Sequence, residues 1–254
     1  MKKGFRILKF KNTKALMEIK NVSKNFDGRP ILKNISLKVF PGQCVGILGP
    51  NGCGKTTLFS MCIGETNVDS GKILINGKSI ERIPIHLRAK EGLGYLPQQR
   101  SLFDMDVFSN LMGLAQISIK GTENQRAVVE NLLTQFNLQH LRRINANLLS
   151  GGEQKRLQIS RIMINKPKVI LLDEPYAALD PTFVHEIQKY IFKIQAMKVA
   201  IIITDHNIKN LFDTTDSNIV ISDGSIIAEG TSRELLKNSR AVSEYFGAGF
   251  DYNI

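Results

Sequence analysis

The sequence lacks long apolar runs, and this excludes a membrane-spanning helix from the prediction. Its most continuous apolar stretches, residues 169–172 and 199–203, are far shorter than the ~18–20 residues that such a helix needs. The Lys-rich N-terminus has no apolar segment behind it, so a secretory signal is not expected either. Internal repeats and low-complexity tracts are also lacking.

Cysteine is scarce. The three cysteines, Cys44, Cys53 and Cys62, stand nine residues apart, without C-x-x-C spacing and without a nearby histidine. This pattern argues against a disulfide framework and against a zinc site, and it favours reduced thiols in a cytosolic protein.

Acidic residues are outnumbered. The 254 residues hold 34 Lys+Arg against 23 Asp+Glu, a formal net charge of +11, while 43% hydrophobic and 22% charged residues argue against disordered and fibrous classes. An excess of this sign favours an anionic partner, namely nucleic acid, acidic lipid or nucleotide phosphate. A solvated basic surface without a partner is the alternative.

The basic residues are concentrated at the N-terminus. Residues 1–16 contain no acid and six basic residues, Lys2, Lys3, Arg6, Lys9, Lys11 and Lys14. We expect a flexible arm over 1–16 ahead of a first strand at 16–20, with contact to an acidic membrane surface as the functional alternative. Translation from Met17 would remove this arm.

The remaining pattern predicts an α/β fold with an inserted helical subdomain. Residues 16–20, 43–48 and 72–76 resemble strands, the last one closed by Asn76-Gly77, which is typical of an antiparallel hairpin. Helical spacing follows at 107–118, 123–136 and 153–165, with Thr122 and Ser150 as expected N-caps. Strands at 168–173, 199–204 and 218–222 then alternate with helices at 182–197 and 207–213, which indicates a largely parallel sheet flanked by helices.

A phosphate-binding loop follows the strand at 43–48. Residues 49–56 fit G-x-x-x-x-G-K-[ST] and precede a helix at 55–64, as the mechanism requires. The backbone N–H groups and the helix N-terminus would hold the phosphates of ATP, Lys55 would reach the β- and γ-phosphates, and Thr56 would supply a hydroxyl to Mg²⁺. The predicted nucleotide-binding residues of this loop are Gly49, Pro50, Asn51, Gly52, Cys53, Gly54, Lys55, Thr56 and Thr57.

A second motif is a hydrophobic strand that ends in two acids, Asp173 and Glu174. Because adjacent side chains in a strand point to opposite sides, the two carboxylates are expected to have different tasks. We expect Asp173 to hold Mg²⁺ through water and Glu174 to act as the base for the attacking water.

Residues 149–154, LSGGEQ, form the motif that most clearly indicates a protein family. This element resembles the signature of ABC-type ATPases, and so do Gln98 in YLPQ, residues 178–180 (ALD) and His206 in TDH, in the same order as in that family across 17–235. The resemblance implies a P-loop NTPase core with an N-terminal antiparallel β-subdomain and a helical subdomain at about 104–165. It also implies that Gln98 contacts Mg²⁺ and the attacking water, that His206 contacts the γ-phosphate, and that Phe26 stacks on adenine.

The family resemblance further implies a homodimer that encloses ATP between the phosphate loop of one copy and the signature of the other. Ser150, Gly151, Gly152 and Glu153 open a helix, which makes a second anion site that is useful only when a γ-phosphate arrives from outside. A symmetric dimer supplies that phosphate.

A single ATPase unit without a membrane span implies separate membrane subunits. Residues 84–89, 92–98, 101–103, 203–207 and 247–250 resemble the ATPases of lipopolysaccharide export transporters, which act on the cytoplasmic face of the inner membrane of Gram-negative-type bacteria. Branched-chain amino acid importer ATPases share several of these residues and are the alternative. A soluble ABC ATPase acting on nucleic acid is the alternative from another class, although the motifs favour no nucleic-acid partner.

Two surfaces would then contact partners. Phe103 would line the groove that receives each of two integral membrane subunits, with Arg88, Leu93 and Tyr95 at its border, although Phe103 could instead be a subdomain core residue. The acids Asp104 and Asp106 depart from the basic residues expected after this phenylalanine. After an ATPase domain over 17–238, the apolar residues Tyr245, Phe246, Gly247 and Phe250 predict a dimerisation tail over 239–254.

Overall fold

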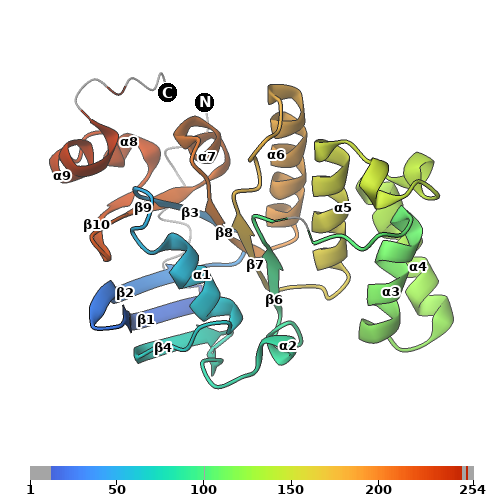
Figure 1. The fold of residues 1–254 in the computed structure, drawn as a ribbon, viewed down its shortest axis with the longest axis horizontal. Coiled ribbons are helices and arrows are strands. Elements are labelled where there is room, and N and C mark those ends of the chain that lie inside the picture. Colours follow the sequence, from blue (N-terminus) through green and yellow to red (C-terminus); the bar gives the residue numbers. More distant parts are fainter. Residues whose placement is uncertain (1–12, 100, 248–249, 251–254) are drawn as a thin grey trace.

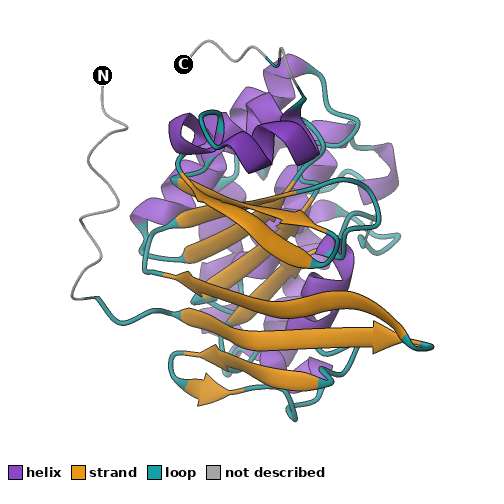
Figure 2. Cartoon of the chain, turned by 90° about the vertical axis from the view of Figure 1, so that its left-hand side faces the viewer, coloured by secondary structure: helices purple, strands orange, loops and turns teal. Residues whose placement is uncertain are grey.

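A computed structural model describes residues 13–99, 101–247 and 250, arranged around two β-sheets (Figures 1 and 2). The basic arm therefore lies outside the described residues up to position 12. The strands are β1 (Met17–Phe26), β2 (Arg29–Val39), β3 (Cys44–Leu48), β4 (Ser70–Ile75), β5 (Lys78–Ser79), β6 (Leu93–Leu96), β7 (Val169–Asp173), β8 (Ala200–Thr204), β9 (Ser217–Ser222) and β10 (Ser225–Gly230). The helices are α1 (Lys55–Ile63), α2 (Ile85–Arg88), α3 (Val107–Ser118), α4 (Thr122–Gln135), α5 (Gly151–Met163), α6 (Pro181–Ala196), α7 (Ile208–Thr214), α8 (Ser232–Leu235) and α9 (Ser239–Ala241).

The first sheet is antiparallel, with the order β2-β1-β4-β5. Ile75 pairs with Lys78 across the predicted Asn-Gly turn. Asn76 and Gly77 both have positive φ, 51° and 82°, as a two-residue turn that matches the strand twist requires. The antiparallel N-terminal subdomain is thus confirmed.

The second sheet is mixed and has the order β10-β9-β3-β8-β7-β6. All its neighbours run parallel except β10, which pairs antiparallel with β9. The edge strands β6 and β10 were not anticipated from the sequence, because β6 has only four residues and most of β10 is only partly buried. The predicted class, a mixed and largely parallel sheet flanked by helices, is confirmed.

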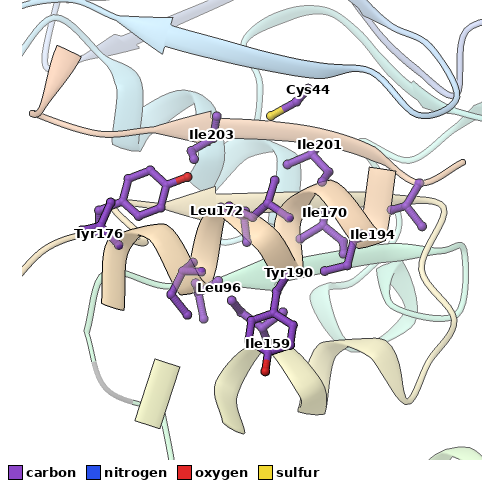
Figure 3. Packing of buried hydrophobic residues seen from close by; sticks show 14 of the residues in the cluster. Cys44, Leu96, Ile159, Ile170, Leu172, Tyr176, Tyr190, Ile194, Ile201 and Ile203 are labelled. Carbon is purple, nitrogen blue, oxygen red and sulfur yellow. The ribbon is translucent and has the colours of Figure 1, made fainter. Parts of the chain in front are cut away.

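Alternation along the central strands divides the core into two layers. Ile170 and Leu172 of β7 pack toward α5 and α6, whereas Val169 and Leu171 pack toward α1 and the antiparallel sheet. Figure 3 shows the first layer, in which Tyr190 of α6 lies near the side chains of β7 and β8. Each such apolar side chain contributes about 1.5–3 kcal/mol by its burial.

Of the three helices of the predicted subdomain, α3 and α4 lie beyond the edge of the second sheet, and α5 lies between them and α6 (Figure 1). Val129 and Leu133 of α4 and Leu111 of α3 are fully buried between them, as the helical spacing predicts. Ser150 is the N-cap of α5, but Gly121 rather than Thr122 caps α4. The N-cap position has φ 85°, a left-handed conformation that glycine adopts readily and threonine only at a cost. Gly121 occupies this position, and Thr122 is the first residue of the helix.

The C-terminal segment folds back on its own chain. Phe246, in a π-helical turn over Val242–Phe246, is 9% exposed, and its ring lies 5.9 Å from that of Phe212 on α7. Phe250 lies 5.5 Å from Phe246 and is 37% exposed. This segment is therefore part of the core, and a role in dimerisation stays a prediction. In the part of the chain that is described, no helix has the length and hydropathy to cross a membrane.

Candidate active site

The phosphate loop and the three residues predicted to be catalytic meet where four neighbouring parallel strands end. The phosphate loop follows β3, His206 follows β8, Glu174 follows β7 and Gln98 follows β6, and these four strands are adjacent in the sheet. The carboxyl ends of parallel strands share one edge, which is where such sheets bind ligands. Topology thus brings together residues that are more than 150 positions apart in the sequence.

The phosphate loop passes directly into α1. Gly54 is the N-cap of that helix with φ 106°, and a Cβ there would press against Leu32 of β2, so only glycine fits. The Lys55 ammonium donates to the carbonyl oxygens of Gly49 and Pro50 at 2.6 and 2.9 Å. The loop therefore presents a cation and the free N–H groups of a helix N-terminus to the same space, which suits a phosphate.

The two acids at the end of β7 occupy different environments, as predicted, but the alternation of side chains along a strand is not the reason. Asp173 ends the strand, is 4% exposed and accepts a hydrogen bond from the Thr204 hydroxyl at 2.6 Å. Glu174 lies beyond the strand with φ 49°, so strand alternation does not apply to it. A left-handed conformation at a non-glycine residue is strained and is characteristic of functional sites.

Glu174 is the centre of a three-residue contact. Its Oε1 lies 2.6 Å from Nε2 of His206, and its Oε2 accepts from Nε2 of Gln98 at 2.8 Å. The Glu174 side chain is 14% exposed, whereas that of His206 is 54% exposed. The three residues predicted to be catalytic are therefore in direct contact, with Glu174 the innermost.

A cavity of about 380 Å³ joins these residues to the phosphate loop. Phe26 lies at its border, 45% exposed, with the Lys24 ammonium 5.2 Å from its ring centroid. Ile31 also lines the cavity but was missed by the sequence analysis, because an apolar residue in a strand pattern carries no functional signal. The lining residues are Phe26, Ile31, Asn51, Gly52, Gly54, Lys55, Thr56, Thr57, Gln98, Glu174 and His206.

Two buried charged residues, Asp205 and Lys155, lie next to this site, and the sequence analysis did not identify either of them as a site residue. Asp205 is 7% exposed and accepts from the backbone N–H groups of Tyr176 and Asn207, and burial raises its pKa. Lys155 of α5 is 8% exposed, and its pKa is lowered by burial despite the nearby carboxylates of Asp205, Asp173 and Glu174. Only the fold shows that this lysine of the signature helix faces the acidic strand end.

The signature segment lies outside the cavity. Ser150 caps α5 through a reciprocal capping box, in which the Ser150 N–H donates to the Glu153 carboxylate at 2.8 Å and the Glu153 N–H donates to the serine hydroxyl at 3.4 Å. A Cβ at Gly152 would overlap the ring of Phe183 on α6, so this glycine is needed for helix packing. Ser150 and Gly151 are exposed, which makes this helix N-terminus accessible from outside.

A groove of about 300 Å³ lies between the helical subdomain and the second sheet. Arg88, Leu93 and Tyr95 are among its lining residues, whereas Phe103, which was expected to line it, is not. Arg88 is 3% exposed and donates to the carbonyl oxygens of Met61 and Cys62, so its first task is to hold the end of α1. Phe103 is 54% exposed and is therefore not a core residue.

Asp104 and Asp106, the departures from the expected pattern, are both used inside the subdomain. Asp106 is the N-cap of α3 and accepts from the Ser109 N–H at 2.6 Å. The Asp104 carboxylate accepts from the side chains of Asn145 and Asn147. Both carboxylates therefore already accept hydrogen bonds from groups of the same chain.

No three His, Cys, Asp or Glu side chains gather into a metal site within residues 13–99, 101–247 and 250. The cavity that contains the phosphate loop is lined by Thr56, which carries a hydroxyl, and by Gln98, whose amide nitrogen donates to Glu174 and whose amide oxygen is a possible ligand. Asp173, next to Glu174 in the chain, is a third oxygen donor at the end of β7. A small set of oxygen donors beside a phosphate site suits Mg²⁺, which is usually held by few protein ligands.

Comparisons with known proteins agree with this geometry. The ABC transporter family matches residues 32–177. The chain is 38% identical over 238 residues to the lipopolysaccharide export system ATP-binding protein LptB of Haemophilus influenzae and 39% identical to that of Escherichia coli K12, covering 93% of this chain and 99% of each relative.

Solved structures give the same result. The ATP-binding cassette MJ1267 of an ABC transporter superposes with a TM-score of 0.83 at 28% identity, covering 92% of this chain and all of that one. CbiO1 of Clostridium perfringens, part of the ABC transporter complex CbiONQ, superposes with a TM-score of 0.80 at 31% identity, covering 90% and 93% of the two chains. This chain is therefore an ATP-binding, ATP-hydrolysing subunit of the ABC transporter family.

Proposed function

We propose that this protein hydrolyses ATP to drive the extraction of lipopolysaccharide from the inner membrane and its export. The observation that carries the proposal is the identity of 38–39% with LptB proteins over 93% of the chain, combined with an intact cavity in which Gln98, Glu174 and His206 meet the phosphate loop. An importer of branched-chain amino acids is the alternative within the family.

Hydrolysis in this proposal is carried out by the residues around Glu174. The phosphate loop and Lys55 bind the triphosphate, and Phe26 stacks on the adenine. Glu174 takes a proton from the water that attacks the γ-phosphorus in line, and the bond to the β–γ bridging oxygen breaks to leave ADP. His206 and Gln98, both bonded to Glu174, hold the carboxylate and the water in position.

Mg²⁺ fits the donor set beside the phosphate loop. Thr56 and Gln98 would supply oxygen ligands, and Asp173 would act through a bound water, because its carboxylate is buried and already accepts from Thr204. When bound, the cation neutralises charge that develops on the phosphate oxygens.

The signature segment acts across a homodimer. Ser150 and Gly151 are exposed at the N-terminus of α5, where N–H groups and the helix dipole favour an anion. The γ-phosphate held by the partner copy would fill this site, with Gly152 and Glu153 shaping it. We include the C-terminal residues Tyr245, Phe246, Gly247 and Phe250 in the dimer contact, of which Phe250 is the most exposed large apolar side chain.

Two integral membrane subunits dock at the groove beside Phe103, one on each copy of the ATPase. Phe103 is exposed, and Arg161, whose guanidinium stacks over its ring, lines the groove. An exposed aromatic side chain in such a place is typical of the energetic centre of an interface. The protein would then be peripheral on the cytoplasmic face of the inner membrane. The basic arm over residues 1–16, which lies outside the described residues up to position 12, would contact acidic lipid there.

The test is reconstitution of the chain with its co-purifying membrane subunits in vesicles that contain lipopolysaccharide. ATP-dependent release of lipopolysaccharide to an acceptor, absent with Glu174→Gln, supports the proposal. Transport of leucine without lipopolysaccharide release would assign the chain to the importer class. Failure to co-purify with membrane subunits, together with salt-dependent binding to DNA or RNA, would place it with ABC ATPases acting on nucleic acid.

A further inference from the structure

The segment that carries Phe103 is attached to the signature segment rather than to the ATP-binding core. We call residues 101–106 the docking loop and residues 142–149 the signature loop, which leads into Ser150. The two loops pair through their backbones, because the N–H of Ala146 donates to the carbonyl oxygen of Met105 at 3.0 Å. The first two residues of α3, which follow the docking loop, also bind the signature loop: the N–H groups of Val107 and Phe108 donate to the carbonyl oxygens of Ile144 and Arg142 at 3.0 Å.

Asn110 of α3 holds the docking loop from inside. Its side chain is fully buried, accepts from the Phe103 N–H at 3.0 Å and donates to the carbonyl oxygens of Phe103, Met105 and Asp106 at 3.0–3.2 Å. Arg161 of the signature helix α5 completes the attachment, because its guanidinium stacks over the Phe103 ring at 4.6 Å and donates to the Ser101 carbonyl oxygen.

Asp104 joins the two loops from the solvent side. Its Oδ1 accepts from the side-chain amides of Asn145 at 2.9 Å and Asn147 at 2.5 Å. Asn145 in turn accepts from the N–H of Asn147 at 2.8 Å and so caps the 3-10 turn Ala146–Leu148. The chain then runs through buried Leu149, whose carbonyl oxygen accepts from Gln154 of α5, to Ser150.

We propose that Asp104 is a positioning residue: its bridge to Asn145 and Asn147 makes the docking loop and the signature loop move as one body, so that a partner seated on Phe103 sets the position of Ser150. This proposal rests on the proposed docking of membrane subunits at Phe103. The carboxylate that departs from the family pattern thereby has a role, since hydrogen bonds to an ionised acceptor are stronger than those to a neutral one.

The bridge predicts which substitutions break the contact between Asp104 and Asn147 and which second substitution restores it. Asn147→Asp would place two carboxylates within hydrogen-bond distance, so the bridge would open by repulsion. Asp104→Asn combined with Asn147→Asp would restore a donor–acceptor pair between these two positions, in which the amide nitrogen at 104 donates to the carboxylate at 147 and the amide oxygen at 104 still accepts from Asn145. Asp104 and Asn147 are exposed, so these changes leave the core packing unaltered.

The experiment measures ATP hydrolysis by the chain alone and by its complex with the co-purifying membrane subunits. We expect Asn147→Asp to lower the stimulation by those subunits about tenfold, the loss of one charge-assisted hydrogen bond. The double variant should recover most of the stimulation. Asn124→Asp, the same chemical change on exposed α4, is the matched control and should behave like the unaltered chain.

Two further readouts separate coupling from folding. The affinity of the isolated chain for an ATP analogue should be the same in all four proteins, because the bridge does not touch the phosphate loop. The thermal unfolding midpoint of Asn147→Asp should fall by no more than a few degrees, the effect of one lost hydrogen bond, so the chain remains folded at the temperature of the assay. The bridge is refuted if Asn147→Asp is stimulated as strongly as Asn124→Asp, or if the double variant is as poorly stimulated as the single one.

The assay uses ATP hydrolysis alone, so it does not depend on the cargo. Compensation in a complex that releases no lipopolysaccharide would leave the bridge standing and remove the proposed cargo. Lipopolysaccharide release that is equally fast with the unaltered chain and with all three variants would support the proposed cargo and refute the bridge.

Discussion

The imidazole Nε2 of His206 lies 2.6 Å from Oε1 of Glu174, although 31 residues of a strand, a helix and their connections separate the two positions. The contact arises because β7 and β8 are parallel neighbours, so the residues that follow them share one edge of the sheet. It orients the carboxylate toward the cavity that contains the phosphate loop.

Glu174→Gln should abolish most of the hydrolysis while ATP binding is retained. The amide keeps the size of the side chain but cannot accept a proton from water, so we expect kcat to fall at least about 10²-fold. An ATP-bound dimer should accumulate, which size-exclusion chromatography with ATP and a phosphate-release assay would detect. Glu229→Gln, at an exposed position on β10, is the control, and near-normal turnover by Glu174→Gln would exclude this residue as the base.

Phe103→Ala should weaken assembly with the membrane subunits. The ring is 54% exposed in the free chain, so its loss has little effect on folding, whereas the loss of an aromatic anchor from an interface costs about 2 kcal/mol or more. Pull-down with the membrane subunits and nucleotide binding by the free chain are the two measurements. Ile117→Ala, at an 85% exposed apolar residue of α3, is the matched control, and equal assembly of the two variants would count against the groove.

Truncation after Asn238 should lower both the stability of the protomer and the tendency to dimerise. Phe246 is 9% exposed against Phe212, so its removal alone should cost about 3 kcal/mol of unfolding free energy. Phe250→Ala, at a 37% exposed ring, should reduce dimerisation with a smaller loss of stability. Denaturant unfolding and ATP-dependent dimer formation separate the two effects, and an unchanged dimer after truncation would contradict the proposed contact.

Cys53 should react slowly with iodoacetamide at neutral pH. Burial raises the pKa of its thiol, an effect that the Lys55 ammonium 3.9 Å away only partly opposes, so the thiolate fraction is below that of a free cysteine. The alkylation rate should rise with pH and reach its midpoint above the ordinary value of ~8.5. ATP should protect the thiol.

Cys53→Ser provides the control for that experiment. Cys44 and Cys62 are fully buried, and burial raises the pKa of Cys62 to about 12, so neither should react before unfolding. A rate midpoint below that of free cysteine would contradict the dominant effect of burial on this thiol. Modification that leaves ATP binding intact would contradict the placement of Cys53 in the nucleotide site.

Local signals predicted most of the elements. The phosphate loop, the Asn76-Gly77 turn and the Ser150 cap depend on backbone conformations and caps that a few neighbouring residues determine. Thr122 shows the limit, because the choice between two possible caps depends on the φ angle of Gly121. Strands β6 and β10 were missed because an edge strand is stabilised by its neighbour rather than by its own pattern.

The sequence by itself determined the kind of chemistry: a lysine-bearing phosphate loop, an acidic strand end and a signature helix, each specified within a few residues. Only the tertiary structure decided which groups touch. Strand order brings Gln98 and His206 to Glu174, and loop pairing brings Asp104 to Asn145 and Asn147. Contacts between distant segments depend on how whole elements pack, and that packing is the sum of many weak interactions spread over the entire chain.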